Sequence, residues 1–368
     1  MKTLSTDKND SPVFLKQGQA ETLAALRTGF IKQDGKLTRV RVFDTLKRSE
    51  GPEEVIFRKV ESSPAKDLVE HLKRGLTAIR AFSLTATAVP CAVVLIDGWR
   101  RGYPFQAFTA ITVALAVVLL QIATNLYNDY SDYVKLIDLP GTSGGSGVFE
   151  KGWYRPNQIL NSARFAFVAA VVFGIPTLIS HPLEVIIIGG VGLAGTLLYS
   201  HETFGLKYHA LGDLAVFILC GPALVAGYSY TVFGMFSPGL FPIGIFVGLL
   251  ACGLLHANNL QDMHLDRKQG ALTLANTLGY RKSIHLLGGI YLGAALALFY
   301  AVFTDRLPVA ALLAALILIP ATQITFRFKA ALGPDCPSLM GVKVAAAKVH
   351  LIGGVLLGFS LFVAVWFG

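Results

Sequence analysis

The chain has 368 residues, of which 53% are hydrophobic and only 15% are charged, with a formal net charge of +9. A soluble domain carries about 25% charged residues, so this composition argues against an ordinary soluble enzyme. The mean hydropathy of +0.56 instead indicates an all-α, polytopic membrane protein. The positive charge suits anionic headgroups and an anionic substrate, and it gives no reason to invoke nucleic acid.

Residues 1–70 are polar, and we expect them to form a cytosolic extension of a membrane domain over 71–368. Within this extension, the sequence of residues 11–30 predicts a short amphipathic helix. The stretches 36–43 and 54–60 alternate apolar and polar residues around a Glu-Gly-Pro turn, which predicts a β-hairpin. An isolated hairpin is marginally stable in water, so we expect it to pack on the membrane domain or on a partner. Residues 64–73 predict a helix on the membrane surface.

The rest of the chain consists of apolar runs, and a membrane-spanning helix needs about 20 such residues. Nine runs qualify, at roughly 76–96, 105–126, 159–179, 183–199, 214–233, 240–255, 284–303, 309–326 and 349–367. If the N-terminus is cytoplasmic, most loop lysines and arginines lie inside, and only Arg100, Arg101 and Arg306 lie outside. This asymmetry follows the positive-inside rule and predicts a cytoplasmic N-terminus with the long loops on the same side.

An acidic motif ends the second predicted span and reads Asn125-Leu-Tyr-Asn128-Asp129-Tyr-Ser-Asp132. If the helix continues through the motif, Asn125, Asp129 and Asp132 fall at i, i+4 and i+7 on one face. The carboxamides of Asn125 and Asn128 would add oxygen ligands for a cation or contact a diphosphate. The loop then carries Gly-Gly-Ser-Gly at 144–147, which could present backbone N–H groups to phosphate or simply let the loop close.

A second acidic motif ends the sixth predicted span and reads Asn258-Asn259-Leu-Gln-Asp262-Met-His-Leu-Asp266. On a continuing helix, Asn259, Asp262 and Asp266 fall at i, i+3 and i+7, again on one face, with Asn259 as the carboxamide. We expect His256 and His264 to form structural hydrogen bonds. The alternative is that one of them acts as a base and accepts a proton from the ring of an aromatic substrate.

Carboxylates at a membrane edge are energetically expensive, so these motifs mark candidate functional sites. Carboxylates beside carboxamides, without a neighbouring Cys/His set, suit a hard cation such as Mg²⁺, which commonly bridges carboxylates to a substrate phosphate. The motifs therefore predict an enzyme that binds a diphosphate through Mg²⁺. Two alternatives stay open: polar helix ends that only cap the helices, and a cation-coupled transporter. Positions at helix ends beside glycine-rich loops favour the enzyme, because transport sites usually lie near the midplane.

Cationic and aromatic residues of the predicted cytoplasmic loops complete the candidate site. We assign diphosphate contacts to Lys207 and Arg267, with Lys268 behind them, against the alternative that they are ordinary positive loop charges. Tyr199 and Tyr208 would steady a carbocation or the diphosphate, although interfacial tyrosines are also common membrane anchors.

The spacings Asn125-x-x-Asn128-Asp129-x-x-Asp132 and Asp262-x-x-x-Asp266 resemble the two signatures of the UbiA superfamily of intramembrane prenyltransferases. Within it, the chain is most similar to the 1,4-dihydroxy-2-naphthoate prenyltransferases of menaquinone synthesis, through segments 80–86, 125–138, 144–147, 206–213 and 258–279. The resemblance covers roughly residues 74–368. It implies nine helices around an apolar cavity and Mg²⁺-dependent ionisation of a prenyl diphosphate, with the four aspartates of the signatures as metal ligands and catalytic residues.

Two positions depart from that subfamily. Ala271 stands where a lysine is usual after the second motif, so a phosphate-binding charge is lost or replaced by Arg267 or Lys268. Leu136 stands where a glycine is usual before the third acid of the pattern, Asp138, which the resemblance makes a further candidate metal ligand.

We therefore predict an integral membrane prenyltransferase that transfers an isoprenyl group from a prenyl diphosphate to an aromatic acceptor at the cytoplasmic side. The acceptor expected first is 1,4-dihydroxy-2-naphthoate, and a benzoquinone precursor such as 4-hydroxybenzoate comes next. For naphthoate, the resemblance implies loss of the acceptor carboxylate, which reduces the need for a histidine base. A CDP-alcohol phosphotransferase is excluded because the chain lacks a DGxxAR motif.

Overall fold

The computed structural model describes residues 12–33, 35–46, 53–61, 64–137, 145–179, 182–201, 204–268 and 270–367. The chain divides into two compact units: unit 1 comprises Met1–Ala81 and Asn125–Phe165, and unit 2 comprises Phe82–Thr124 and Ala166–Gly368. The functional division into an extension over 1–70 and a membrane domain over 71–368 stays a prediction.

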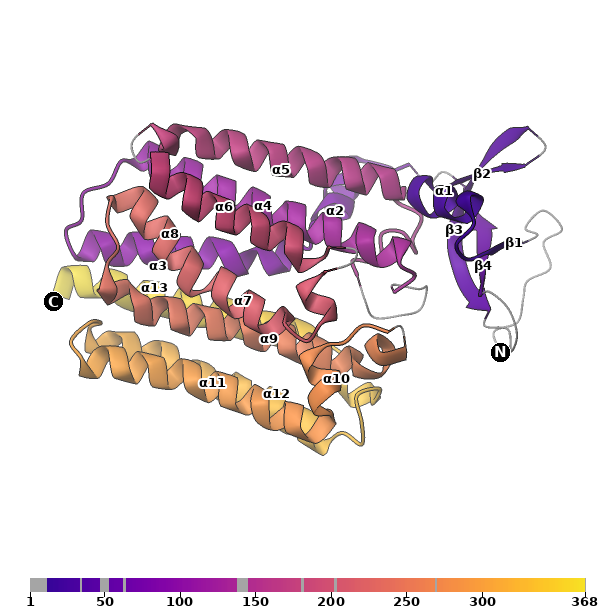
Figure 1. Cartoon of the computed structure of the whole chain (residues 1–368). Helices are drawn as coiled ribbons and strands as arrows, with labels where there is room; N and C mark the ends of the chain where they lie inside the picture. Colours follow the sequence, from indigo (N-terminus) through magenta and orange to yellow (C-terminus); the bar gives the residue numbers. More distant parts are fainter. Residues whose placement is uncertain are drawn as a thin grey trace. The chain divides into compact units, whose positions relative to one another are not determined.

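Unit 1 contains a small antiparallel sheet with the strand order β1-β4-β3-β2, covered by helix α1 (Figure 1). The elements are β1 (Val13–Lys16), α1 (Ala20–Thr28), β2 (Phe30–Gln33), β3 (Lys36–Leu46) and β4 (Glu54–Lys59). The strands β3 and β4 occupy the two alternating stretches and pair with each other. The sequence did not indicate β1 and β2, because four residues each are too few for a period-two pattern to stand out.

The sheet packs on the end of helix α4 (Ala107–Val134) within unit 1. The backbone N–H of Val42 donates a hydrogen bond to Tyr133 Oη at 3.0 Å. Arg39 donates to the carbonyl oxygen of Gly152 at 2.7 Å, so the segment before helix α5 (Pro156–Leu178) is tied to the sheet as well. These contacts attach the marginal sheet to a long helix.

Nine helical segments of the described chain are long and apolar enough to cross a membrane, which confirms the predicted number and fold class. They hold α3 (Thr85–Arg100), α4, α5, α6 (Pro182–Tyr199), α7 (Gly212–Cys220) with α8 (Pro222–Phe233), α9 (Phe241–Lys268), α11 (Tyr280–Phe303), α12 (Leu318–Ala330) with the 3-10 turn before it, and α13 (Val342–Phe367). The protein is therefore an integral membrane protein with a small polar sheet.

Two span boundaries differ from the sequence prediction. The surface helix α2 (Leu68–Ala78) begins at the N-cap Asp67 and runs further than expected, so the first span begins at Ala81. Arg80 separates the two because its φ of 52° lies in the left-handed region, which interrupts a right-handed helix. The fifth span is split at Gly221, after which Pro222 starts α8 in the position that proline favours.

The helices α9, α11 and α13 of unit 2 run lengthwise beside one another, and their connections gather at two ends (Figure 1). One end carries the connections 200–211, 269–279 and 331–341. The other carries 101–106, 234–240 and 304–308. The second acidic motif, at the end of α9, lies at the first of these ends.

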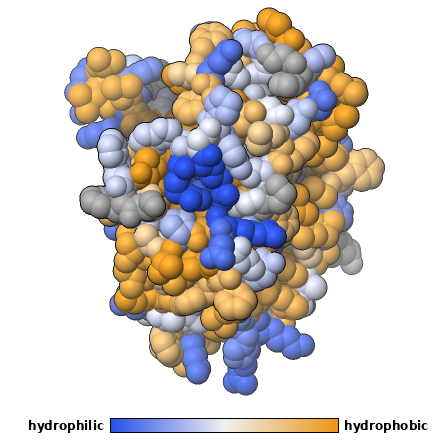
Figure 2. All heavy atoms as spheres, turned by 90° about the vertical axis from the view of Figure 1, so that its left-hand side faces the viewer, coloured by the Kyte–Doolittle hydropathy of each residue, from blue (hydrophilic) through white to orange (hydrophobic). Residues whose placement is uncertain are grey.

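The opposite end of unit 2 holds a compact ionic cluster around Asp97, whose side chain is fully buried. The Nε atoms of Arg100 and Arg101 donate to its two oxygens at 2.7 and 2.6 Å, and Arg101 also donates to the carbonyl oxygen of Arg306. Figure 2 shows a hydrophilic patch amid apolar surface on this end of the molecule. Because two of its arginines share one buried carboxylate, this end carries less uncompensated positive charge than its arginine count indicates.

Glycines allow close packing of α9 against α7, and this generates a stability prediction. A Cβ at Gly248 would lie 2.6 Å from the backbone oxygen of Phe217 and 2.9 Å from Gly221 Cα, so the helices would have to separate. We expect Gly248→Ala to destabilise the protein by about 1–3 kcal/mol. Gly289→Ala on α11 is the control, because nothing lies within 4 Å of its added Cβ. Thermal unfolding in detergent measures both, and equal midpoints would contradict the packing argument.

Candidate functional site

The first acidic motif forms a half-site on α4 in unit 1. Because α4 continues to Val134, Asn125, Asp129 and Asp132 share one face of the helix, as the spacing predicted. All three are buried, with exposed fractions of 8%, 2% and 6%. Carboxylates at such burial need compensating partners, since desolvation of an unpaired charge costs several kcal/mol.

Arg80 supplies that compensation, and it was noted in the sequence only for its resemblance to the family pattern. Its guanidinium donates to Oδ1 of Asp129, and the backbone N–H of Ser146 donates to Oδ2 at 3.2 Å. The Asn125 carboxamide donates to the carbonyl oxygen of Ile79 at 2.9 Å, which holds the turn carrying Arg80 against α4. Within its described part, the glycine-rich run therefore contacts the Asp129 carboxylate through the backbone N–H of Ser146.

Leu136 ends the turn that follows α4, and its backbone has the conformation that the usual glycine would adopt. Its φ is 60°, in the left-handed region, and residues with this conformation at helix ends are commonly glycine. Leucine can adopt this conformation only at a cost of about 1 kcal/mol or more. The chain therefore keeps the glycine-type turn without the glycine. Asp138 lies outside the described residues.

The second acidic motif forms a half-site on α9 in unit 2. Since α9 continues to Lys268, Asn259, Asp262 and Asp266 share one face, again as predicted, and both aspartates are half-buried. Lys343, near the start of α13, forms an ion pair with Asp262, whose side chain is 13% exposed. The sequence did not single out Lys343, because nothing local links it to a carboxylate 81 residues earlier.

The loops beside this half-site are joined by backbone contacts. The N–H of Ala210 donates to the carbonyl oxygen of Leu272 at 2.7 Å, so the connection after α6 pairs with the connection after α9. Lys207 lies in a short 3-10 turn, with its Nζ 4.6 Å from the centre of the Tyr208 ring. Ala271 is buried, and its methyl side chain brings no charge to the loop.

Among the other predicted residues of unit 2, Tyr199 ends α6 and is half-buried, whereas Arg267 and Lys268 are exposed at the end of α9. They lie on the same end of unit 2 as Asp262 and Asp266.

The two histidines of this region have different surroundings. His256 is fully buried, with Nδ1 3.2 Å from an Asp213 carboxylate oxygen and Nε2 3.1 Å from the carbonyl oxygen of Ser283. His264 is exposed and pairs with Asp335 at 2.7 Å. Both nitrogens of His256 are therefore engaged in contacts that join α9 to α7 and α11.

The donor chemistry of each half-site fits a hard divalent cation. Each helix face presents two carboxylates and a carboxamide, and oxygen donors of this kind are the ligands that Mg²⁺ prefers. Within the described ranges, no three Asp, Glu, His or Cys side chains converge on one point. Each half-site alone thus offers a partial shell, and Mg²⁺ commonly completes such a shell with water and substrate phosphate.

The pair of Arg80 and Asp129 can be tested by a double-mutant cycle. Arg80→Met leaves a buried, uncompensated carboxylate, and we expect it to destabilise the protein by on the order of 3 kcal/mol. Arg80→Met combined with Asp129→Asn should recover part of this loss, because no unpaired charge remains. Thermal or denaturant unfolding of the four proteins measures the coupling, and strictly additive losses would show that the pair contributes nothing. The exposed pair of His264 and Asp335 serves as a comparison, with an expected coupling of under about 1 kcal/mol.

Comparison with known proteins places this architecture in a family. The model of the UbiA prenyltransferase family matches residues 87–346. The protein named "UbiA prenyltransferase domain-containing protein 1" from Rattus norvegicus is 30% identical over 254 residues, covering 67% of this chain and 71% of that protein. The 1,4-dihydroxy-2-naphthoate octaprenyltransferase of Escherichia coli (strain K12) is 28% identical over 217 residues, covering 57% of this chain and 70% of the enzyme.

A solved structure of a UbiA homolog from Archaeoglobus fulgidus, bound to GPP and Mg²⁺, has the same fold. It aligns with a TM-score of 0.53 and 14% identity over 77% of this chain and 99% of that one. The family match covers most of the membrane-spanning region and includes both acidic motifs. The chain therefore belongs to the UbiA prenyltransferase family and is a membrane prenyltransferase.

Proposed function

We propose that this protein transfers an isoprenyl group from a prenyl diphosphate to 1,4-dihydroxy-2-naphthoate in a Mg²⁺-dependent reaction. The observation that carries the proposal is the pair of carboxylate-bearing helix faces at the ends of α4 and α9. The similarity to a naphthoate octaprenyltransferase supports the acceptor. The fold shared with a homolog that binds GPP and Mg²⁺ supports the donor and the metal.

In this proposal the two acidic motifs serve one diphosphate. Asp129 and Asp132 from α4, together with Asp262 and Asp266 from α9, would hold Mg²⁺, with Asp138 as a further ligand. When bound, Mg²⁺ neutralises the diphosphate and makes it a better leaving group.

The polar neighbours of these aspartates hold the donor and the carboxylates in place. Arg80 and Lys343 keep Asp129 and Asp262 oriented by the ion pairs described above. The carboxamides of Asn125, Asn128 and Asn259 complete the polar surface of the two helix faces. Cationic loop residues would bind the diphosphate oxygens directly: Lys207, Arg267 and Lys268.

The chemical step breaks the bond between C1 of the prenyl group and the diphosphate oxygen, and the electron pair leaves with the diphosphate. Tyr199 and Tyr208 would stabilise the resulting allylic cation through their ring faces. The electron-rich ring carbon that bears the carboxylate then forms the new carbon–carbon bond. Departure of the acceptor carboxylate as CO₂ returns its bonding electrons to the ring, so no histidine base is required. This agrees with the engagement of both His256 nitrogens in structural contacts.

We further propose that the reacting end of the protein faces the cytoplasm, in a membrane of the bacterial cytoplasmic type. The helix ends on this side of unit 2 carry several lysines and arginines, among them Arg267 and Lys268 of α9 and Arg281 and Lys282 of α11. At the opposite end, Asp97 compensates Arg100 and Arg101. This difference strengthens the positive-inside asymmetry.

The function is tested with purified protein in detergent, Mg²⁺, labelled geranylgeranyl or octaprenyl diphosphate and separate acceptors. We expect the decarboxylated product, prenylated 1,4-dihydroxynaphthalene, as the main product, no product with EDTA, and a loss on the order of 10²-fold in Asp132→Asn, equivalent to about 3 kcal/mol of transition-state stabilisation. Asp305→Asn, which removes an exposed aspartate near the opposite end, should keep full activity. If only 4-hydroxybenzoate gave a product, 4-hydroxybenzoate would be the acceptor in place of dihydroxynaphthoate. Full activity in EDTA would refute the metal dependence.

The ion pair of Lys343 with Asp262 gives a second prediction that does not depend on activity. Without metal, Lys343→Met leaves Asp262 without its cation, so the unfolding midpoint should fall more than in Lys348→Met, which removes an exposed charge from the same helix. Added Mg²⁺ should then raise the midpoint of Lys343→Met more than that of the wild type, because the metal replaces the lost charge. An equal Mg²⁺ response in all three proteins would contradict metal binding at Asp262.

A further inference from the structure

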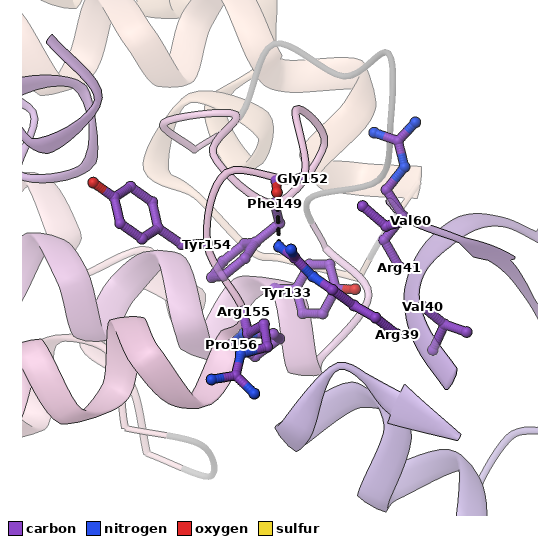
Figure 3. A pocket seen from close by; sticks show the side chains of 10 residues that line it. All are labelled: Arg39, Val40, Arg41, Val60, Tyr133, Phe149, Gly152, Tyr154, Arg155 and Pro156. Carbon is purple, nitrogen blue, oxygen red and sulfur yellow. Dashed lines mark hydrogen bonds between the residues drawn. The ribbon is translucent and has the colours of Figure 1, made fainter. Parts of the chain in front are cut away.

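A small, open pocket in unit 1 lies beside β3, the last turn of α4 and the segment that leads into α5. Its polar walls are formed by Arg39, Arg41, Arg155, Tyr133 and Tyr154 (Figure 3). None of these residues belongs to the acidic motifs or to the predicted diphosphate contacts. The pocket therefore needs an explanation of its own.

Three arginines line this pocket, and a fourth lies on the neighbouring strand. Arg39 and Arg41 are two residues apart on β3 and share one face of the sheet, and Arg58 lies directly opposite Arg41 on β4. Like charges directly opposite on neighbouring strands destabilise a sheet. Burial lowers the pKa of the Arg39 guanidinium below its ordinary value, and the positive charge of Arg155 lowers it further. The pocket is thus a region of concentrated positive charge.

The side-chain contacts recorded for these arginines within the described ranges are to a backbone carbonyl and to aromatic rings. Arg39 donates to the Gly152 carbonyl, Arg155 lies 5.0 Å from the centre of the Phe30 ring, and Arg58 lies 3.6 Å from that of Phe43. In Figure 3 the guanidinium groups of Arg41 and Arg155 extend away from that of Arg39. None of the ion pairs recorded among the described residues involves these four arginines.

The acid nearest in sequence on the same strand is Asp44, which lies beyond the bulge in β3 and accepts a hydrogen bond from the Thr45 N–H. It does not enter the lining of the pocket. Guanidinium groups match the oxygens of phosphate in geometry and charge, and aromatic stacking leaves their N–H edges available. A phosphate-type anion would therefore relieve the repulsion that the sheet imposes.

We propose that the pocket beside Arg39 and Arg41 binds a phosphate group, supplied by free phosphate or by the headgroup of an anionic lipid. Such binding is separate from the prenyl transfer site. Because Tyr133 and Gly152 connect the pocket to α4 and to the segment before α5, the bound anion stabilises unit 1.

The test uses the full chain in nanodiscs of phosphatidylcholine, with EDTA present so that metal-dependent diphosphate binding is silent. Inorganic phosphate is titrated at constant ionic strength against chloride, and the unfolding midpoint is measured. We expect phosphate to raise the midpoint of the wild type. In Arg39→Gln/Arg41→Gln the apparent affinity should fall at least tenfold. Lys36→Gln/Lys59→Gln removes two exposed charges from the same strands and should respond like the wild type.

Arg41→Gln alone is the control for misfolding, because no side-chain hydrogen bond recorded among the described residues involves Arg41. It should bind phosphate more weakly, while its midpoint in chloride is no lower than that of the wild type, because a like charge opposite Arg58 is removed. Equal weakening in both double variants, or unchanged phosphate binding in Arg39→Gln/Arg41→Gln, would overturn the proposal.

A second arm identifies the source of the phosphate group. In nanodiscs with phosphatidylglycerol, a lipid-binding pocket predicts a higher midpoint without added phosphate, lost in Arg39→Gln/Arg41→Gln. A pocket for free phosphate predicts the same phosphate response in both lipids. Either result supports the site, and no response to phosphate or phosphatidylglycerol refutes it. Asp132→Asn should keep the response, which separates this result from any failure of the prenyl transfer proposal.

Discussion

The burial of carboxylates at helix ends is the constraint on which the functional architecture depends. Asp129 is almost completely buried, and Asp262 is largely so, in positions where the membrane edge makes an unpaired charge costly. The chain meets this cost with Arg80 and Lys343, cations drawn from other helices or turns. In the proposed function, the same carboxylates would exchange these partners for a divalent cation and a diphosphate, and the ion pairs hold them in position until then.

The sequence predicted the parts of this structure that arise from local composition. Apolar runs located the nine spans, and acids at i, i+3, i+4 and i+7 located the two helix faces, because α4 and α9 continue beyond their apolar parts. The pairings of Arg80 with Asp129 and Lys343 with Asp262 could not be predicted, since they join residues 49 and 81 positions apart. The left-handed backbone at Arg80 was equally invisible, because it depends on tertiary contacts rather than on residue type.

The two residues that depart from the family pattern, Leu136 and Ala271, have different physical consequences. Leu136 keeps a left-handed turn that glycine would adopt more cheaply, so backbone geometry is preserved at a conformational cost. Ala271 is buried in a loop whose backbone pairs with the connection after α6, so the loop keeps its structure without a charge at this position. In the proposed function, Lys207, Arg267 and Lys268 would supply the positive charge that Ala271 does not.

Binding of a non-reactive prenyl thiodiphosphate tests most directly whether both acidic motifs serve one substrate. Calorimetric titration with Mg²⁺ would compare the wild type with Asp132→Asn and Asp266→Asn, and Asp305→Asn would control for loss of a negative charge. We predict that each motif variant alone weakens Mg²⁺-dependent binding at least tenfold, whereas the control binds like the wild type. Wild-type affinity in either motif variant would contradict a shared diphosphate site.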